Sequence, residues 1–284
     1  MAGRFTRVES RRRARKLVLG LLSDLPRKNC WTIAEWAGDR PLDGMQHLLG
    51  RATWDADQVR DDMGDYVVEH LHDDEAVLVA DETGDVKKGT DTAGAQRQYT
   101  GTAGRIENAQ VAVYLVYAGH RGHTAVDQEL YVPRSWTSDP DRCRAVGLGD
   151  KTEFATKPEP AARAVTRFLD AGHRAAWVAG DEVHGGNPRL RTALEERGTG
   201  YILAVACSHE VITGTGKFRA NEHDRHPSPD ELIPLTCNEI QQLFITPVVQ
   251  RVFAPVHRLG RSVWRRRHQA RSQTSHYRRQ AAQA

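Results

Sequence analysis

The chain has 284 residues, of which 39% are hydrophobic, and its 40 Lys and Arg against 37 Asp and Glu give a net charge of +3. These values fit a globular, soluble, intracellular protein with one large domain or two modest ones. No apolar run is long enough to cross a membrane, and no apolar segment follows the basic N-terminus, so neither a membrane span nor a signal peptide is expected. The four cysteines lie far apart without C-x-x-C spacing, which favours reduced thiols in the cytoplasm over a zinc site or disulfides.

Short helices are predicted for a first domain, residues 1–72. The first helix is basic, with seven positive residues against one acid over residues 4–16. Asn29 is placed to cap a second helix, Pro41 lies in the first turn of a third, and a fourth begins near Asp55. Such helices suit a helix-turn-helix that docks in the DNA major groove, and they equally suit a bundle that supports the core. DNA binding by this domain is therefore one of two open interpretations.

A second domain, residues 73–220, is predicted to be α/β. The expected strands lie at 77–80, 111–117, 124–132, 175–180 and 201–205. The expected helices lie at 158–170 and 187–197, and a polar loop lies at 85–104. The four apolar residues Val77–Ala80 favour a strand buried on both faces. The short connection at 119–122 makes the second and third strands an antiparallel hairpin. The order βββ-α-β-α-β is that of a ribonuclease-H-like mixed sheet.

Two of these strands are each followed by an acid. Asp81 would lie where the first strand leaves the sheet, and Asp181 follows the fourth strand. Open α/β sheets place their sites at strand ends, and two carboxylates that converge there suit a hard divalent cation. Each Asp taken alone also fits the first residue of a turn. The matched pair favours a site.

Residues 15–219 resemble an insertion-sequence transposase of the DDE superfamily, in its DDE-endonuclease branch. The motifs that carry the resemblance are Ala80-Asp81-Glu82-Thr83-Gly84, Lys87-Lys88-Gly89, Arg97-Gln98-Tyr99, Leu130-Tyr131-Val132-Pro133 with Trp136, and Gly180-Asp181-Glu182-Val183. His184 stands where the family usually has Tyr. The resemblance implies an Asp-Asp-Glu triad that binds Mg²⁺, with Mn²⁺ as an alternative, and an enzyme that nicks double-stranded DNA at element ends and joins it to a target. Asp81 and Asp181 would be the first two acids, both catalytic and metal-binding, and a homodimer is one form of assembly that fits.

The third acid of the family, a Glu, has no evident counterpart here. The resemblance runs to residue 219 and then jumps, between about residues 220 and 228, to a sequence similar to the family's C-terminal tail. The remaining acids after the fifth strand are Glu210, Glu222, Asp224, Asp230, Glu231 and Glu239. None of them lies in a sequence similar to the Glu helix of the family. We therefore expect an internal deletion and a catalytically defective protein.

Basic residues are the remaining candidates for DNA contacts. Lys87, Lys88 and Arg97 lie in the predicted polar loop after Asp81, where they could hold DNA phosphates or form a solvated surface. Residues 221–284 form a basic tail, helical or disordered, and its Arg265, Arg266 and Arg267 could neutralise phosphates without reading sequence. His120, His123 and His184 are expected on the surface.

Three classes of function follow from these patterns. The first is an insertion-sequence transposase, supported by the paired acids and by the family motifs. The second is a non-catalytic DNA-binding remnant that occupies element ends and inhibits an intact copy. The third is another ribonuclease-H-like nuclease, which leaves the basic helical N-terminus unexplained.

Overall fold

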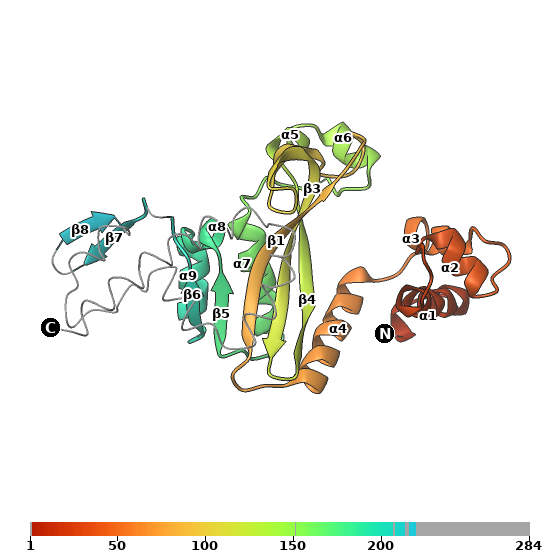
Figure 1. Ribbon diagram of the computed structural model, residues 1–284, viewed down its shortest axis with the longest axis horizontal. Helices are drawn as coiled ribbons and strands as arrows, with labels where there is room; N and C mark the ends of the chain where they lie inside the picture. The colour runs from red at the N-terminus through yellow and green to blue at the C-terminus, as the bar shows by residue number, and fades with distance from the viewer. Residues whose placement is uncertain (1, 151, 207, 214–215, 220–284) are drawn as a thin grey trace, which may run out of the picture. The chain divides into compact units, whose positions relative to one another are not determined.

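A computed structural model describes residues 2–150, 152–206, 208–213 and 216–219 (Figure 1). The chain divides into two compact units, Met1–Tyr66 and Val67–Ala284. The predicted tail 221–284, with Arg265, Arg266 and Arg267, lies outside the described residues. No described helix combines the length and the apolar character that a bilayer span requires.

The first unit is helical. It contains a short 3₁₀ turn, η1 (Ala2–Arg4), the helices α1 (Val8–Leu22), α2 (Cys30–Trp36) and α3 (Gly44–Gly50), and the start of α4 (Ala56–Leu71). Asn29 caps α2 as predicted, because its side chain accepts hydrogen bonds from two backbone N–H groups of the first turn. A Cβ on Gly20 would lie 2.5 Å from Ile33 Cγ2, so the glycine lets α1 and α2 pack closely. The expected start of the third helix at Pro41 is wrong: the backbone makes a turn there, and the helix begins at Gly44.

The second unit is built on a six-stranded mixed sheet. Its strands are β1 (Val77–Val86), β2 (Gln96–Thr100), β3 (Arg105–Gly119), β4 (Gly122–Tyr131), β5 (Trp177–Gly180) and β6 (Gly200–Leu203). The pairing order is β4-β3-β1-β5-β6. β2 pairs with the first residues of β3, Arg105–Ala109. β1, β3 and β4 are antiparallel neighbours, whereas β5 and β6 run parallel to β1. This α/β arrangement agrees with the predicted ribonuclease-H-like fold.

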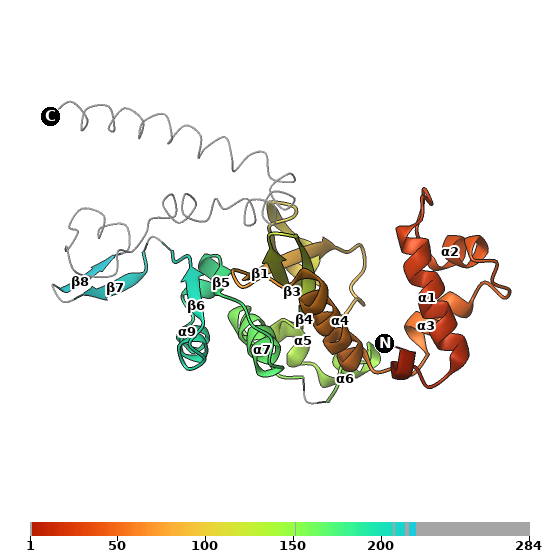
Figure 2. The ribbon, with the colours of Figure 1, turned by 90° about the horizontal axis from the view of Figure 1, so that it is seen from below.

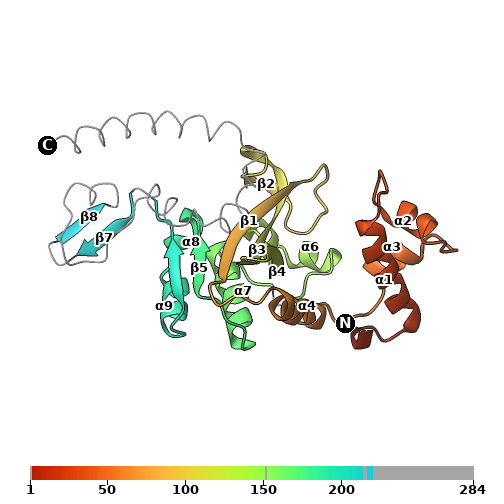
Figure 3. The ribbon, with the colours of Figure 1, turned by 60° about the horizontal axis from the view of Figure 1, so that its bottom comes forward.

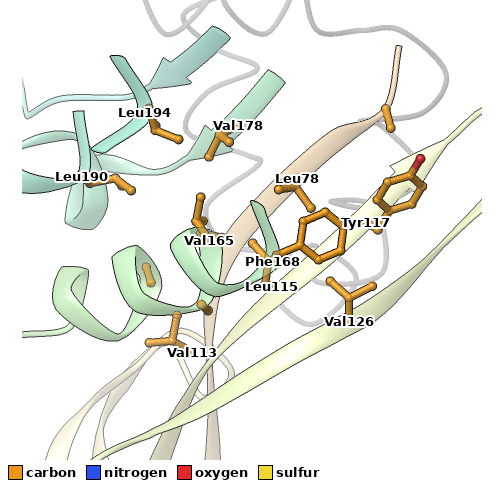
Figure 4. Packing of buried hydrophobic residues seen from close by; sticks show 14 of the residues in the cluster. Leu78, Val113, Leu115, Tyr117, Val126, Val165, Phe168, Val178, Leu190 and Leu194 are labelled. Carbon is orange, nitrogen blue, oxygen red and sulfur yellow. The ribbon is translucent and has the colours of Figure 1, made fainter. Parts of the chain in front are cut away.

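Helices cover one face of this sheet. α7 (Pro158–Asp170) and α9 (Pro188–Glu195) lie along that face in Figures 2 and 3. Figure 4 shows their contact with the sheet, where Val165 and Phe168 of α7 and Leu190 of α9 face Leu78 of β1 and Leu115 of β3. The core therefore holds α7 against the central strand.

β1 is buried on both faces, as its sequence predicted. Leu78 and Ala80 belong to the core under α7, while Val77 and Val79 belong to a second cluster with Ala118 and Ala179. All four residues of the apolar run Val77–Ala80 are less than 10% exposed. The strand that carries Asp81 is therefore the rigid centre of the second unit.

The predicted polar loop at 85–104 is wrong in part. β1 continues to Val86 by pairing with β3, and residues 96–100 form β2 on the other side of β3. Gly84 permits this arrangement, because a Cβ at that position would lie 1.9 Å from Thr100 Oγ1. Elements that the sequence did not predict are α5 (Arg134–Thr137), α6 (Pro140–Ala145), α8 (Glu182–Gly185) and the hairpin of β7 (Glu210–Thr213) and β8 (Gly216–Arg219).

Candidate metal centre

Asp81 and Asp181 lie side by side where the parallel pairing of β1 and β5 ends. The last paired residues of these strands are Ala80 and Gly180, and each acid is the next residue of its chain. Neighbouring strands are about 5 Å apart. The structure therefore brings together the two acids that the sequence singled out.

The expectation that Asp81 lies at the end of its strand is wrong on one side. β1 continues beyond Asp81, which pairs with Tyr114 of β3. On its other side, β1 is paired with β5 only as far as Ala80, because β5 stops at Gly180 and the chain turns into α8. Asp181 caps that helix, and its Oδ1 accepts a hydrogen bond of 3.0 Å from the Val183 N–H.

The two carboxylates are half-buried, and other negative groups lie near each of them. Burial, joined by the charges of Asp181 and Glu82, raises the pKa of Asp81 to about 6. Burial also raises the pKa of Asp181, while the nearby His184 acts in the opposite direction. The surroundings therefore disfavour a negative charge on either acid, and a bound cation would relieve this.

A buried polar cluster adjoins the acids. Glu82 Oε1 is paired with Lys157 Nζ at 2.6 Å, and its other oxygen is buried without a hydrogen-bond partner. His184 is fully buried, with neither ring nitrogen hydrogen-bonded, and its Nε2 lies 4.0 Å from Asp181 Oδ1. Burial lowers the pKa of His184, so its imidazole is neutral at neutral pH.

His184 is buried because two glycines let α8 fold back onto the sheet. A Cβ on Gly180 would lie 3.2 Å from His184 Cβ, and one on Gly185 would lie 1.8 Å from the Ala204 carbonyl oxygen. The expected surface position is therefore wrong for His184, whereas His120 and His123 are exposed.

Sequence reasoning missed the roles of Glu82, Lys157 and His184 in this cluster. Strand alternation offered one signal, since Glu82 follows Asp81 and must face the opposite side of β1. Lys157 precedes the helix-starting Pro158, but nothing in the local sequence links it to a residue 75 positions earlier.

Lys87, Lys88 and Arg97 lie away from the two acids. Lys87 follows the end of β1 and is about 20 Å along the strand from Asp81, at about 3.3 Å per residue. Its N–H donates to the carbonyl of Asn108, the residue that pairs with Arg97 across β2 and β3. The side chain of Lys87 pairs with Asp85, and those of Lys88 and Arg97 are exposed. These three residues thus lie together where β1 ends and β3 begins.

A third acid is not found beside the pair in the described part of the chain. There, no group of three or more His, Cys, Asp or Glu side chains could hold a metal ion. Glu210 lies in the β7-β8 hairpin, where Lys217 Nζ is 2.6 Å from its carboxylate and holds its pKa below the usual range. Glu222, Asp224, Asp230, Glu231 and Glu239 lie outside the described residues.

Comparison with known proteins identifies the family. The sequence profile described as DDE superfamily endonuclease matches residues 1–274. The chain belongs to this family. A "Probable transposase for insertion sequence element IS701" from Microchaete diplosiphon is 34% identical over 197 residues, which cover 69% of this chain and 49% of that protein.

The chain spans about half the length of the curated relative that it matches. No solved structure is significantly similar to it. The family assignment agrees with the resemblance that the sequence motifs carried, including those around Asp81 and Asp181. Endonucleases of this superfamily typically use divalent metals, and the two acids offer the oxygen ligands that such ions prefer.

Proposed function

We propose that this chain derives from an insertion-sequence transposase, binds a divalent metal through Asp81 and Asp181, binds double-stranded DNA at element ends and target, and is defective in DNA cleavage. The adjacency of the two acids at the end of the β1-β5 pairing carries the proposal. Family membership supplies the reaction class, which is metal-dependent cleavage and strand transfer.

The two carboxylates fit Mg²⁺, with Mn²⁺ as a substitute. Mg²⁺ is commonly held by one or two carboxylates, with waters and substrate phosphates in its other positions. When bound, a pair of such ions activates a water and stabilises the leaving oxygen of a phosphodiester. Asp81 is held by the rigid β1 and Asp181 by its capping of α8, so both side chains are positioned before any ion arrives.

Incomplete metal binding is the reason for the expected defect. Among the described residues only two acids meet, and a second ion would lack protein ligands. The match to a longer relative, of which the aligned residues cover 49%, is compatible with the loss of an internal block that carries the third acid. A chain that binds element ends without cutting them would compete with an intact copy.

Basic groups supply the DNA contacts in this proposal. Lys87, Lys88 and Arg97 lie together at the far end of β1 and β3, where they would contact phosphates away from the metal. Arg265, Arg266 and Arg267 would act on phosphates without reading sequence. Such contacts make binding sensitive to salt.

The test is incubation of the purified chain with element-end DNA and Mg²⁺ or Mn²⁺, beside an Asp81→Ala variant. We expect binding of the DNA by both proteins and no nicking above the level of the variant, because the second ion lacks a ligand. Cleavage that disappears in Asp81→Ala would contradict the defect. It would also make Glu210, Glu231 and Glu239 the next acids to replace.

A further inference from the structure

The β2–β3 hairpin carries two exposed apolar side chains that the proposed function leaves unused. Tyr99 of β2 lies directly opposite Ile106 of β3, and each is 57% exposed. The hairpin projects beyond the ends of β5 and β6 (Figure 3). Large apolar residues that lie exposed side by side are typical of a contact surface rather than of a hairpin that only faces water.

One face of β2 is fixed to the body of the second unit, and the other is turned outward. Gln98 Nε2 donates a hydrogen bond of 2.7 Å to the Ala109 carbonyl, and Thr100 is buried. Successive side chains of a strand point to opposite faces, so Arg97 and Tyr99 share the outward face. Both are therefore held in place before any partner arrives.

Positive charge surrounds the outward-facing Tyr99. Arg97 lies two residues away on the same face, about 6.6 Å along the strand. Asn108, opposite Arg97, donates through Nδ2 to the two backbone carbonyls that flank Lys88, at 2.8 and 2.9 Å. The side chains of Arg97 and Lys88 are exposed, and neither forms an ion pair with a residue that the structure describes. An aromatic ring beside two unneutralised cations fits a partner that has both phosphates and flat rings.

The hairpin pair and the candidate metal centre lie on the same face of the sheet. Ile106 is eight residues before Tyr114 on β3, and Tyr114 is paired with Asp81. An even number of residues keeps both side chains on one face, and the separation is about 26 Å at about 3.3 Å per residue. DNA advances about 3.4 Å per base pair, so one DNA molecule could reach both places, roughly eight base pairs apart.

On the basis of the DNA binding proposed above, we propose that Tyr99 stacks on an unpaired base of DNA, with Ile106 beside it and with Arg97 and Lys88 on neighbouring phosphates. Bases inside an intact duplex cover one another, so an aromatic side chain on a sheet reaches the plane of a base only where the strand is unpaired. Aromatic rings next to basic groups bind single strands in this way without reading sequence. The hairpin therefore gives the chain an affinity for single-stranded or locally melted DNA.

The test measures the affinity of the full chain for two labelled DNA probes by fluorescence anisotropy, in EDTA and at one salt concentration. One probe is a single-stranded oligothymidine of about 20 nucleotides, longer than the usual binding sites of single-strand platforms, and the other is a duplex of the same length. Tyr99→Ala should weaken binding of the single strand about tenfold and leave binding of the duplex unchanged. Tyr99→Phe should bind the single strand within about twofold of the unaltered chain, whereas Tyr99→Leu should lose as much as Tyr99→Ala, because leucine has no ring to stack.

Val86→Ala is the matched control. Val86 is 51% exposed at the same end of the sheet, and it pairs with Ala109, which is three residues from Ile106 and so faces the opposite side. Its replacement should change neither affinity. Urea unfolding of each variant shows whether it is folded. If Tyr99→Ala is not, single-strand affinity that Tyr99→Leu retains in full overturns the inference.

The outcomes separate this inference from the proposed function. If the unaltered chain binds neither probe, the proposed DNA binding is wrong and the role of Tyr99 falls with it. If it binds the duplex but Tyr99→Ala does not weaken single-strand binding, only the stacking role is wrong. An equal loss on both probes also overturns the inference. A smaller oligomer of Tyr99→Ala than of the unaltered chain in size-exclusion chromatography would show that the pair joins two copies of the chain instead.

Discussion

Asp81 is a half-buried acid whose negative charge is disfavoured by its surroundings. Its carboxylate is placed on a central strand of the second unit, beside a second carboxylate and next to Glu82. Burial is the largest cause of its raised pKa, with value about 6, and the charge of Asp181 adds to it. Strongly perturbed carboxylates are found where function requires them more often than elsewhere. The cost in stability is itself an argument for a cation site.

Asp81→Asn should therefore stabilise the metal-free chain at pH 7.5. A carboxyl whose folded pKa is raised from its unfolded value of 3.8 destabilises the fold above the folded pKa of about 6, and this penalty disappears as pH falls toward 3.8. We expect a gain of about 1–3 kcal/mol in the free energy of unfolding at pH 7.5. Urea unfolding at pH 7.5 and 5.0 checks this, and the gain should shrink at the lower pH. A variant less stable than the unaltered chain at pH 7.5 would contradict it.

At the scale of elements, β1 was predictable in its first half and not in its second. Its apolar run Val77–Ala80 and the acid behind it were evident from the sequence. The extension through Glu82–Val86 depends on pairing with β3 and on the fit of Gly84 against Thr100, which are contacts between distant residues. Local pattern could not show them.

Gly84→Ala tests this close contact. An added Cβ would lie 1.9 Å from Thr100 Oγ1 and 2.5 Å from Thr100 Cβ, so β1 or β2 must shift. We expect a loss of about 1–3 kcal/mol in the free energy of unfolding, measured by urea. Gly89→Ala is the control, since nothing lies within 4 Å of a Cβ there, and its effect should stay within about 0.5 kcal/mol. Equal effects of the two substitutions would contradict the role given to Gly84.

Other elements show the same division between local and distant causes. The sequence predicted α7 at Pro158–Asp170 and the Asn29 cap of α2, because proline, capping side chains and helical spacing are local signals. The pairing of β3 with β4 is irregular between Leu115 and Val116 of β3, and no local signal in the sequence predicted this. The irregularity leaves Asp127 of β4 buried and paired with Arg167 at 2.7 Å. The two acids of the site were found because a strand-end acid is a local pattern that repeats. The Glu82–Lys157 pair was missed because it joins residues 75 positions apart and therefore leaves no local pattern in the sequence.

At the scale of the whole molecule, the charges are unevenly distributed along the sequence. Nine arginines and no acid follow Glu239, so residues 1–239 carry a net charge of −6 although the whole chain is at +3. Within residues 4–16 the balance is again strongly positive. Two separate stretches can therefore attract DNA, and they are expected to do so in different ways.

The tail should act as a clamp on phosphates that does not discriminate between DNA sequences. Each phosphate neutralised changes the slope of log K against log salt by about 0.9, so replacing Arg265, Arg266 and Arg267 by Ala should make that slope shallower by about 2–3. The loss should be equal on element-end and on scrambled DNA, measured by fluorescence anisotropy over a range of salt concentrations.

A second triple variant separates charge from recognition. Arg11, Arg12 and Arg15 are exposed on α1 of the first unit, and their replacement by Ala removes the same charge. If sequence preference resides in residues 1–72, this variant should lose discrimination between element-end and scrambled DNA, whereas the tail variant should keep it. An unchanged salt slope in the tail variant would show that residues 265–267 make no phosphate contacts. Equal loss of discrimination in both variants would show that recognition is not confined to the helical unit.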